Sequence, residues 1–375
     1  MAPPSETTPA YESAEIRSIA QKHGLNVQRM HHGQPILEPV AGHSWESKVV
    51  LNPGVALVTH KEQLESMMEQ WELSDAKREI LRKSGGAAIM LYRAQGEVEP
   101  EKGLAPSYMG LAVFTPELEL VWRRKQPVIT PEAPFHNRGV EDGRCTMVDG
   151  TCYFFYTGYF HDEAKGENHV QICLATSKDF IHWELKGPLE GGLNKVDNKN
   201  AVLFPKKIHG QRVLLHRPMQ GEDAKAIHWA VAEDLEGPWK SRGRLMASYR
   251  FSEFSESWIG AGGPPISLGN NRYLTIYHQG HFTSEGKREY DLSATILEFP
   301  APGECIVERR LEPLMRPTGA AEQQGDKSLG VDNVLFSCAN YIWGDYLVIP
   351  YAGADSRIFG AKVNFEKLVS EIERA

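Results

Sequence analysis

The feature that most constrains the fold is a repeated phrase: an apolar strand, a turn with Gly or Asn, then an aromatic-rich strand. It reads TMVDGTCYFFYTGY, FPKKIHGQRVLLHRP, PPISLGNNRYLTIYHQG and CANYIWGDYLVIPYAGA, with a degenerate first copy, GGAAIMLYRAQG. The copies are 64, 60, 61 and 74 residues apart, measured between the corresponding positions Tyr92, Tyr156, His216, Tyr277 and Tyr351. A period of this kind is typical of folds that place one supersecondary unit in each repeat.

A second phrase of alternating residues follows most copies, as in MGLAVFTPELELVW, ICLATSKDFIHW and IHWAVAEDLEGPW. Each unit therefore holds about four strands, which is the content of one propeller blade. We predict an all-β fold, a five-bladed β-propeller, and a β-sandwich with long loops is the structural alternative. A propeller gathers the inner strands around one axis, so residues from distant repeats can meet at one site.

Two helical segments are expected beside the strands. Tyr11 to His23 is predicted to form a short amphipathic helix after a loose tail. The stretch 61–83, rich in Glu, Met, Leu and Lys, is predicted to be a helical insertion in the first blade that closes at Gly85-Gly86. We therefore divide the chain into an N-terminal tail and helix, residues 1–30, and a propeller domain, residues 31–375.

Composition narrows the partners. Hydrophobic residues make up 41% of the 375 residues and the net charge is −8, with both signs interspersed, which argues against a nucleic-acid partner. Neither a signal-peptide core nor an apolar run of membrane-spanning length is found, so a cytoplasmic location is expected. Buried reduced thiols are favoured over disulfides or a metal site for the five scattered cysteines, Cys145, Cys152, Cys173, Cys305 and Cys338.

The densest polar cluster is NRGVEDGR, residues 137–144, just before the inner strand of the second blade. A carboxylic acid in an enclosed pocket can have a raised pKa and donate a proton to a leaving oxygen, and Asp142 is the candidate. Glu141 and Arg144 are open to a different interpretation, a structural ion pair that ties blades together.

Basic residues concentrate in later repeats. Arg217 lies in an apolar inner strand, where a guanidinium needs an anionic partner. That partner is either a protein carboxylate or a bound anion such as phosphate. His278 occupies the equivalent place one blade later, and Tyr290 and Arg93 complete the ring. This set fits an anionic or polyhydroxylated ligand.

Together these motifs resemble glycoside hydrolase family 130, the β-mannoside phosphorylases and β-mannosidases. The resemblance runs from about Pro35 to Leu368, through LNPGV, LYRAQG, RGVEDGR, NAVLFPKKI with LLHRP, GAGGPPI with YHQG, YDLSATIL, and VDNVLFSC with PYAGADSRI. It implies a five-bladed propeller and an inverting single displacement. It also implies inorganic phosphate as co-substrate, with no other cofactor and no metal.

The resemblance also implies residue roles. Asp142 becomes the proton donor, acting through a hydroxyl of the mannosyl ring. The implied phosphate ligands are Arg217, His278, Tyr290, Lys199 and Asn200. The implied substrate-binding residues are Arg93, which would help hold the reacting sugar, with Asn52, Glu141, Arg144 and Asp332.

Three positions depart from the family pattern: Gly143 replaces a Pro, Lys199 replaces an Arg, and Trp258 replaces a common Lys. A hydrolytic member would instead need a carboxylate that activates water, and Glu253, Glu256 and Glu289 are the candidates.

We expect phosphorolysis of β-mannosidic bonds in manno-oligosaccharides to α-mannose 1-phosphate. An inverting β-mannosidase is the alternative, and a sugar-binding propeller without turnover comes third. The expected partners are an oligosaccharide or glycoside and phosphate, with no nucleic acid and no membrane, and a homo-oligomer is left open.

Overall fold

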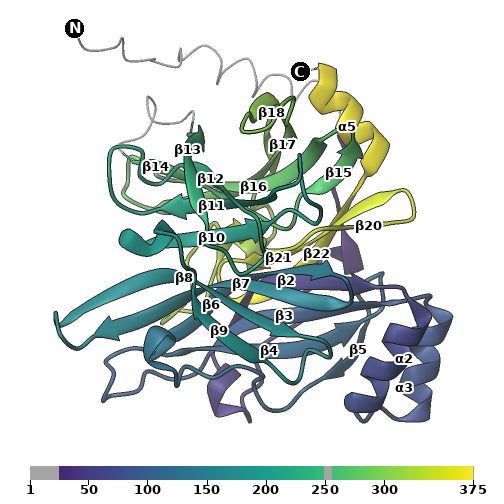
Figure 1. Ribbon diagram of the computed structural model, residues 1–375. Helices are drawn as coiled ribbons and strands as arrows, with labels where there is room; N and C mark the ends of the chain where they lie inside the picture. Colours follow the sequence, from purple (N-terminus) through teal and green to yellow (C-terminus); the bar gives the residue numbers. More distant parts are fainter. Residues whose placement is uncertain (1–24, 249–255, 375) are drawn as a thin grey trace, which may run out of the picture.

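The structure is a computed structural model that describes residues 25–248 and 256–374, and it is mostly β-strand (Figure 1). Its strands fall into five successive antiparallel units. The first unit contains β2 (Val49–Val58), β3 (Ala87–Gln95), β4 (Ser107–Phe114) and β5 (Leu120–Arg123). The second contains β6 (Gly139–Val148), β7 (Thr151–Asp162), β8 (Glu167–Ser177) and β9 (Glu184–Pro188).

The remaining units follow in chain order. The third contains β10 (Asn198–Leu203), β11 (Arg212–Pro218), β12 (Ile227–Ala232) and β13 (Lys240–Met246). The fourth contains β14 (Ser257–Ala261), β15 (Ile266–Gly269), β16 (Arg272–Phe282), β17 (Arg288–Glu298) and β18 (Ile306–Met315). The fifth contains β19 (Leu335–Phe336), β20 (Tyr341–Trp343), β21 (Tyr346–Gly353), β22 (Arg357–Asn364) and the N-terminal β1 (Gln28–Arg29).

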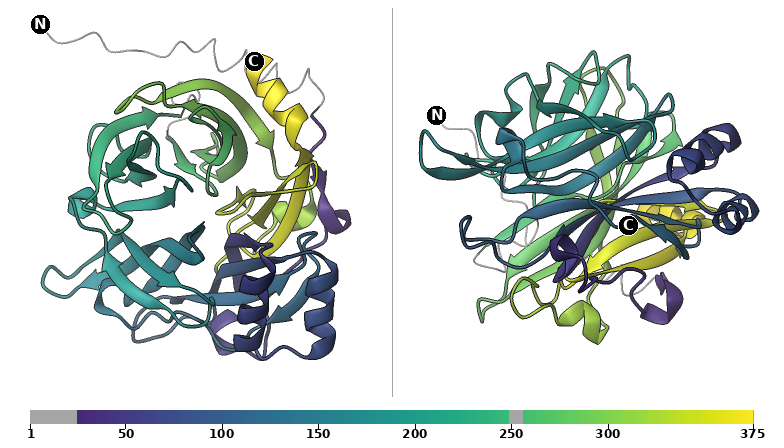
Figure 2. Two further views of the ribbon diagram at one scale, coloured as in Figure 1. Left: turned by 45° about the vertical axis from the view of Figure 1, so that its right-hand side comes forward. Right: turned by 90° about the horizontal axis from the view of Figure 1, so that it is seen from below.

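The units are arranged around a common axis, as the left view of Figure 2 shows. The first two form one eight-stranded sheet, because a single parallel pair, Ser107 with Gly139, joins β4 to β6. The repeat positions Tyr92, Tyr156, His216, Tyr277 and Tyr351 lie on β3, β7, β11, β16 and β21, and all five are buried. The repeat in the sequence thus corresponds to one unit each time.

The fifth unit takes strands from both ends of the described chain. Gln28 and Arg29, which the sequence assigned to an N-terminal segment, pair with Lys362 and Ala361 of β22. Glu322 reinforces this closure, since its carboxylate accepts hydrogen bonds from Arg29 Nε at 2.7 Å and from the Tyr351 hydroxyl. Burial raises the pKa of Glu322, but these bonds outweigh it and lower the pKa overall.

The helical insertion differs from its prediction as one segment over 61–83. It forms two helices, α2 (Lys61–Gln70) and α3 (Asp75–Lys83), separated by a turn in which Glu72 has φ of 52°. Trp71, in that turn, is buried and stacks on Trp122 of β5 with ring centroids 6.3 Å apart. Fixing this indole on the sheet interrupts the helix. The predicted helix from Tyr11 to His23 lies outside the described residues.

The other helices are short. The two α-helices near the C-terminus are α4 (Ala320–Gln323) and α5 (Phe365–Arg374), and α5 packs through Leu368 and Ile372. The 3-10 turns are η1 (Met30–Gly33), η2 (Ser44–Glu46), η3 (Pro134–His136) and η4 (Leu193–Lys195). Within the described residues, none of the helices is long and apolar enough to cross a membrane.

A bulge interrupts the first strand of three units at the same place. The pairing register shifts between Leu51 and Gly54, between Glu141 and Arg144, and between Lys199 and Val202. The residue inside each bulge has positive φ: Asn52 at 50°, Asp142 at 49° and Asn200 at 57°. Asn and Asp tolerate this left-handed conformation better than other L-residues. Bulges re-aim side chains, so these three point away from an ordinary strand direction.

Candidate active site

Asp142 is buried in its bulge on β6, with 8% of its surface exposed. Asn52 Nδ2, from the matching bulge of the first unit, donates a hydrogen bond to Asp142 Oδ1 at 2.7 Å. Arg93 Nη1 lies 3.4 Å from the same oxygen. The candidate acid is therefore held by two residues of the neighbouring unit.

Glu141 fixes the arginine that faces the acid. Arg93 Nη2 lies 2.8 Å from Glu141 Oε1, and Arg93 Nε donates to the Ser107 hydroxyl at 2.9 Å. The Ser107 hydroxyl in turn donates to Glu141 Oε1 at 3.0 Å. These three mutual contacts among Arg93, Ser107 and Glu141 orient the Arg93 guanidinium. The position of Glu141 therefore follows from its contact with Arg93.

The pKa of Asp142 shifts in the opposite direction from the expectation. Burial raises it, but Arg93, the hydrogen bond from Asn52, and the charges of Arg144 and Lys199 lower it more, so the pKa lies below its ordinary value. Without a bound anion, the carboxyl is ionised at neutral pH.

Asp355 is a further acidic residue of this site, and the sequence analysis did not single it out. It lies in the turn between β21 and β22. Burial raises the pKa of Asp355 to about 6, with Arg93 lowering it and the Asp142 carboxylate raising it. Its segment, PYAGADSRI, belongs to the resemblance described above, but that resemblance assigns no role to Asp355. The left-handed backbone that brings the side chain inward, φ of 48° at both Ala354 and Asp355, is not readable from those letters.

The basic residues meet on the third and fourth units. Arg217 Nη1, on β11, lies 3.2 Å from His278 Nε2, on β16, in position to donate to it. Burial lowers the pKa of Arg217 to about 10, while the charge of Asp142 raises it. Asp142 and Arg217 are therefore within electrostatic reach of each other.

Lys199 lies between the acidic and basic sides. Burial lowers its pKa and Arg217 adds to that effect, whereas Glu141 and Asp142 raise it. The backbone of Lys199 pairs directly with Arg217 across β10 and β11. The lysine thus adds a second positive charge next to Arg217.

His278 and Tyr290 form an aromatic wall. Burial and then Arg217 lower the pKa of His278 well below its ordinary value, so the imidazole is neutral. Its ring centroid lies 6.1 Å from that of Tyr290 and 4.2 Å from that of Phe336. Trp258, at 5.3 Å, packs edge-on against Tyr290. In this chain the position of a common family Lys thus carries an indole that positions Tyr290.

Several buried polar atoms on the basic side have no hydrogen-bond partner among the described residues: Asn200 Nδ2 and Oδ1, Arg217 Nε and His278 Nδ1. Buried polar groups are normally paired, because an unpaired one costs about 1–3 kcal/mol. A cluster of such atoms beside two cations is the arrangement expected where an anionic ligand supplies the missing partners.

Arg144 lies behind the site. It is 1% exposed, and its guanidinium donates to the backbone oxygens of Gly262 at 3.2 Å, Ala261 at 2.7 Å and Asp142. These bonds tie the second unit to the fourth. They favour the structural interpretation of Arg144, although the partners are backbone carbonyls and not the Glu141 carboxylate.

The remaining predicted residues that the structure describes contact groups other than the acid. Asp332 is exposed and accepts a hydrogen bond from the Gly325 amide at 3.0 Å. Glu256 forms an ion pair with Lys225, and Glu289 lies 3.5 Å from His281 with its side chain 44% exposed. Glu253 lies outside the described residues. None of these contacts of Asp332, Glu256 and Glu289 involves Asp142.

The departure at Gly143 has a local cause. A Cβ at this position would lie 1.9 Å from Cζ of Phe154, so the phenylalanine ring fills the space that a proline would need. Metal ligation has no support in the described part of the chain, where no group of three or more His, Cys, Asp or Glu side chains could hold an ion.

Comparison with known proteins places this site in context. The family model of glycoside hydrolase 130, described as beta-1,4-mannooligosaccharide phosphorylase, matches residues 82–374. A 1,2-beta-oligomannan phosphorylase of Thermoanaerobacter sp. (strain X514) is 31% identical over 327 residues, covering 87% of this chain and 93% of that protein. A beta-1,2-mannobiose phosphorylase of the same organism is 28% identical over 337 residues, covering 89% and 96%.

The fold matches solved structures as well. The beta-1,2-mannobiose phosphorylase from Listeria innocua, solved with beta-1,2-mannobiose, superposes with a TM-score of 0.70 at 21% identity. The match covers 94% of this chain and 100% of that one. The matched structures of this family are five-bladed β-propellers.

Proposed function

The chain belongs to glycoside hydrolase family 130, and on this premise we propose that it is a β-mannoside phosphorylase built as a five-bladed β-propeller. One observation carries the proposal. Asp142, held by Asn52 and Arg93, lies within electrostatic reach of an Arg217–His278 pair in which Arg217 Nε and His278 Nδ1 have no hydrogen-bond partner among the described residues.

The proposed reaction is a single displacement. Phosphate, bound by Arg217, Lys199, His278 and Tyr290, attacks the anomeric carbon of the terminal mannosyl unit. The bond from that carbon to the glycosidic oxygen breaks, and the oxygen takes the proton that Asp142 supplies through a hydroxyl of the sugar. The configuration inverts, giving α-mannose 1-phosphate and a shortened oligosaccharide. Cations fixed around the phosphate stabilise its charge without reorganising during the reaction.

Phosphate also has a role in protonating the acid. With the charges of the protein alone, Asp142 is ionised because Arg93, Arg144 and Lys199 lower its pKa. A phosphate dianion beside Lys199 and Arg217 offsets part of that positive charge, which raises the pKa of Asp142. The co-substrate thereby favours the protonated form that the bond cleavage needs.

Assays of glycosidic-bond cleavage with and without phosphate test this function. The purified protein is incubated with β-1,2-mannobiose and, separately, β-1,4-mannobiose, because the two curated relatives described above are named for β-1,2 linkages and the family model for β-1,4. Phosphorus NMR then follows mannose 1-phosphate. Phosphate-dependent formation of the α-anomer is expected. Free mannose formed equally without phosphate would mean hydrolysis, and no product from either substrate would mean a sugar-binding protein.

A further inference from the structure

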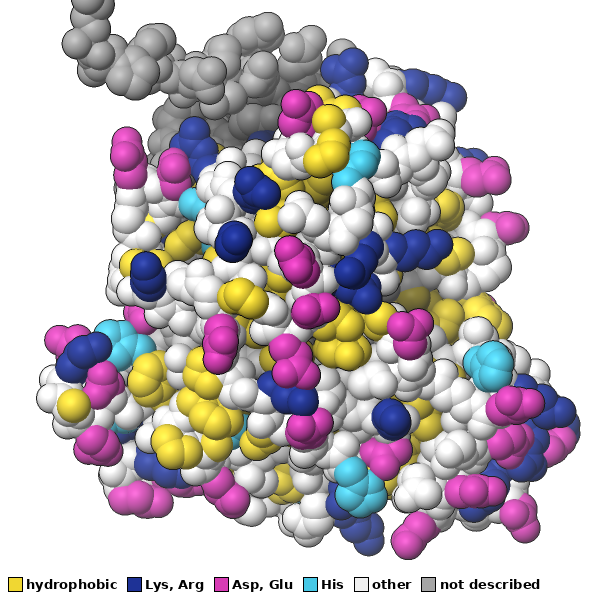
Figure 3. Space-filling model, viewed as in Figure 1, with side chains coloured by type: hydrophobic (Ala, Val, Ile, Leu, Met, Phe, Trp, Pro, Cys, Tyr) yellow, Lys and Arg dark blue, Asp and Glu magenta, His cyan; other side chains and the backbone are white. Residues whose placement is uncertain are grey.

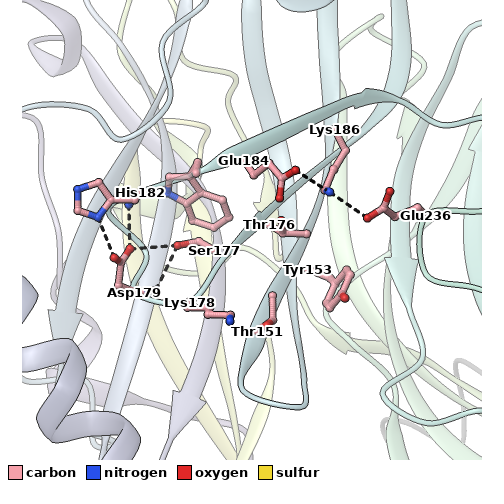
Figure 4. Close-up of a pocket in the computed structure, with 11 residues that line it drawn as sticks. Thr151, Tyr153, Thr176, Ser177, Lys178, Asp179, His182, Glu184, Lys186 and Glu236 are labelled. Atoms are coloured by element: carbon pink, nitrogen blue, oxygen red, sulfur yellow. Dashed lines mark hydrogen bonds and ion pairs between the residues drawn. The ribbon is translucent and has the colours of Figure 1, made fainter.

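We propose a second saccharide-binding site on the outer part of the second unit, for a neutral oligosaccharide (Figure 4). A cavity of about 580 Å³ opens there, within the ~300–1,000 Å³ range of ligand pockets. Its lining includes Tyr153, Thr176, Asp179, Trp183 and Lys186. Glu236, from the loop between β12 and β13 of the third unit, completes it.

The floor of the cavity is a row of side chains across three strands. Tyr153 on β7 pairs with Thr176 on β8, which pairs with Glu184 on β9. Directly paired residues present their side chains on the same face of a sheet, and Thr151 lies on that face two residues before Tyr153. The floor therefore alternates an aromatic ring, hydroxyls and a carboxylate.

Most of the charged side chains around this floor have partners within the protein. Lys186 Nζ lies 2.7 Å from Glu184 Oε1 and 3.0 Å from Glu236 Oε1. On the other side, Asp179 accepts hydrogen bonds from the amides of Ile181 and His182 at 2.8 Å each, and its Oδ2 lies 2.8 Å from His182 Nδ1. Figure 4 shows these two clusters flanking Thr151, Tyr153 and Thr176.

This pattern selects the chemistry of the ligand. Counting Lys178 and Lys186 against Asp179, Glu184 and Glu236, the lining carries one more negative than positive charge, so it does not favour an anion. Lys186 and Asp179 already have partners within the protein. Both clusters still hold rigid donors and acceptors at fixed positions. A neutral ligand with many hydroxyl groups matches such a surface at little desolvation cost.

Aromatic faces supply the apolar contact that a sugar ring needs. Tyr153 and Trp183 are both partly exposed at the cavity. The Trp183 indole is fixed, because its Nε1 donates to the Phe180 oxygen at 3.1 Å and its ring packs on Phe154, 5.5 Å between centroids. Rings that combine an apolar face with a polar edge suit a ligand that has both kinds of surface.

The cavity is distinct from the reaction centre. Thr157, which pairs with Glu141 beside the acid, lies four residues beyond Tyr153 on β7, and four extended residues span ~13 Å. Tyr153 also packs, like Leu235, against a core cluster made of residues from the second and third units. That the saccharide is a manno-oligosaccharide rests on the proposed function, whereas the neutral, polyhydroxylated class rests on the cavity alone.

Calorimetry on the Asp142→Asn protein tests the site apart from turnover, with β-1,4-mannohexaose and β-1,2-mannotriose as probes and cellohexaose as a non-mannoside probe. We expect two binding events per chain for at least one of these saccharides. Adding Thr176→Arg, which fills the cavity, should weaken the second event at least ~10-fold. Glu236→Ala, on an exposed loop, should weaken it too. Tyr153→Ala should also weaken the second event. Its matched control is Tyr346→Ala, at a partly exposed tyrosine on β21, which should keep both events.

A single binding event that Thr176→Arg and Tyr153→Ala both leave unchanged would overturn the second site. Two events that survive both substitutions would overturn its location here. Binding of cellohexaose alone, lost in Thr176→Arg, would keep the site and correct its sugar. Failure of the phosphorolysis assay with two events still present would remove the proposed function and leave this site standing, because the two readouts are separate.

Discussion

The two sides of the reaction centre differ in how completely the protein satisfies them. On the acidic side Asn52, Arg93, Ser107 and Glu141 bond to one another or to Asp142 at 2.7–3.4 Å. On the basic side Asn200, Arg217 and His278 leave buried atoms without partners among the described residues. On the acidic side, Asn52 Oδ1 is the exception among these groups, whereas the basic side leaves four such atoms. Since unpaired buried polar atoms are costly, we propose that the bound anion supplies partners on the basic side.

This difference between the acidic and basic sides fits the task that each side has in the proposed reaction. The acid needs a fixed orientation relative to the sugar, and a closed set of hydrogen bonds gives it one. In the proposed reaction, the basic side binds and releases a charged molecule in every cycle. Burial lowers the pKa of both His278 and Arg217 there, so a positive charge on this side costs desolvation. Acidic and basic side chains are otherwise interspersed over the face seen in Figure 3.

The largest effect is expected on the acidic side. Asp142→Asn keeps the size of the side chain but removes the transferable proton, so turnover should fall ~10²–10⁴-fold with the melting temperature little changed. Steady-state phosphorolysis and thermal unfolding measure both. Asp149→Asn, in the exposed turn after β6, is the matched control and should retain activity. A retained rate in Asp142→Asn would assign the acid to another residue.

On the basic side the effect should appear in phosphate affinity. Arg217→Ala removes charge-assisted hydrogen bonds worth ~1.5–3 kcal/mol, so the KM for phosphate should rise ~10–100-fold. Arg212→Ala, on the same strand, should leave it unchanged. If Arg217→Ala alters only the KM for the mannoside, the anion binds elsewhere and the division between the two sides is wrong.

A subtler change tests the geometry of the basic side. A Cβ on Gly260 would lie 2.5 Å from His278 Nε2 and 2.9 Å from Asn200 Oδ1, so Gly260→Ala should displace both. We expect the KM for phosphate to rise up to ~10-fold, with the affinity for mannoside nearly constant. Gly42→Ala, where a Cβ meets nothing within 4 Å, is the control. An unchanged KM would show that His278 does not contact the anion.

The smallest effect concerns pH and links the two sides. A group whose pKa is lowered, as that of Asp142 is by the surrounding cations, loses its proton at a lower pH than usual. Bound phosphate should raise that pKa, so the decline in rate with rising pH should begin at higher pH when phosphate is saturating. A shift of up to ~1 pH unit is expected. Rate profiles at low and high phosphate measure it, and coincident profiles would mean that phosphate does not influence Asp142.

Residues tied to the repeat could be predicted from the sequence. The repeat positions Tyr92, Tyr156 and Tyr277 predicted the second strand of their units. The dense polar cluster next to one of these strands indicated Asp142. Contacts set by three-dimensional proximity could not be predicted. Arg144 binds carbonyls almost 120 residues away, at Ala261 and Gly262. Asp355 reaches the site through a turn of unusual backbone conformation.

The same limit explains the helical insertion. Residues 61–83 have a composition that favours a helix throughout, and local preference alone gave one segment. The break at residues 71–74 comes from docking Trp71 onto Trp122, a contact made with the sheet. Tertiary packing therefore decided what propensity left open.

The pairing of β1 with β22 has a consequence for how the molecule is made. Translation delivers the chain from its N-terminus, yet β1 has no partner until β22, ending at Asn364, has left the ribosome. Until then β1 has no partner strand in the nascent polypeptide, and an unpaired strand is prone to wrong associations. The contact between β1 and β22 therefore forms late, and the ring of units cannot close until β22 has been synthesised.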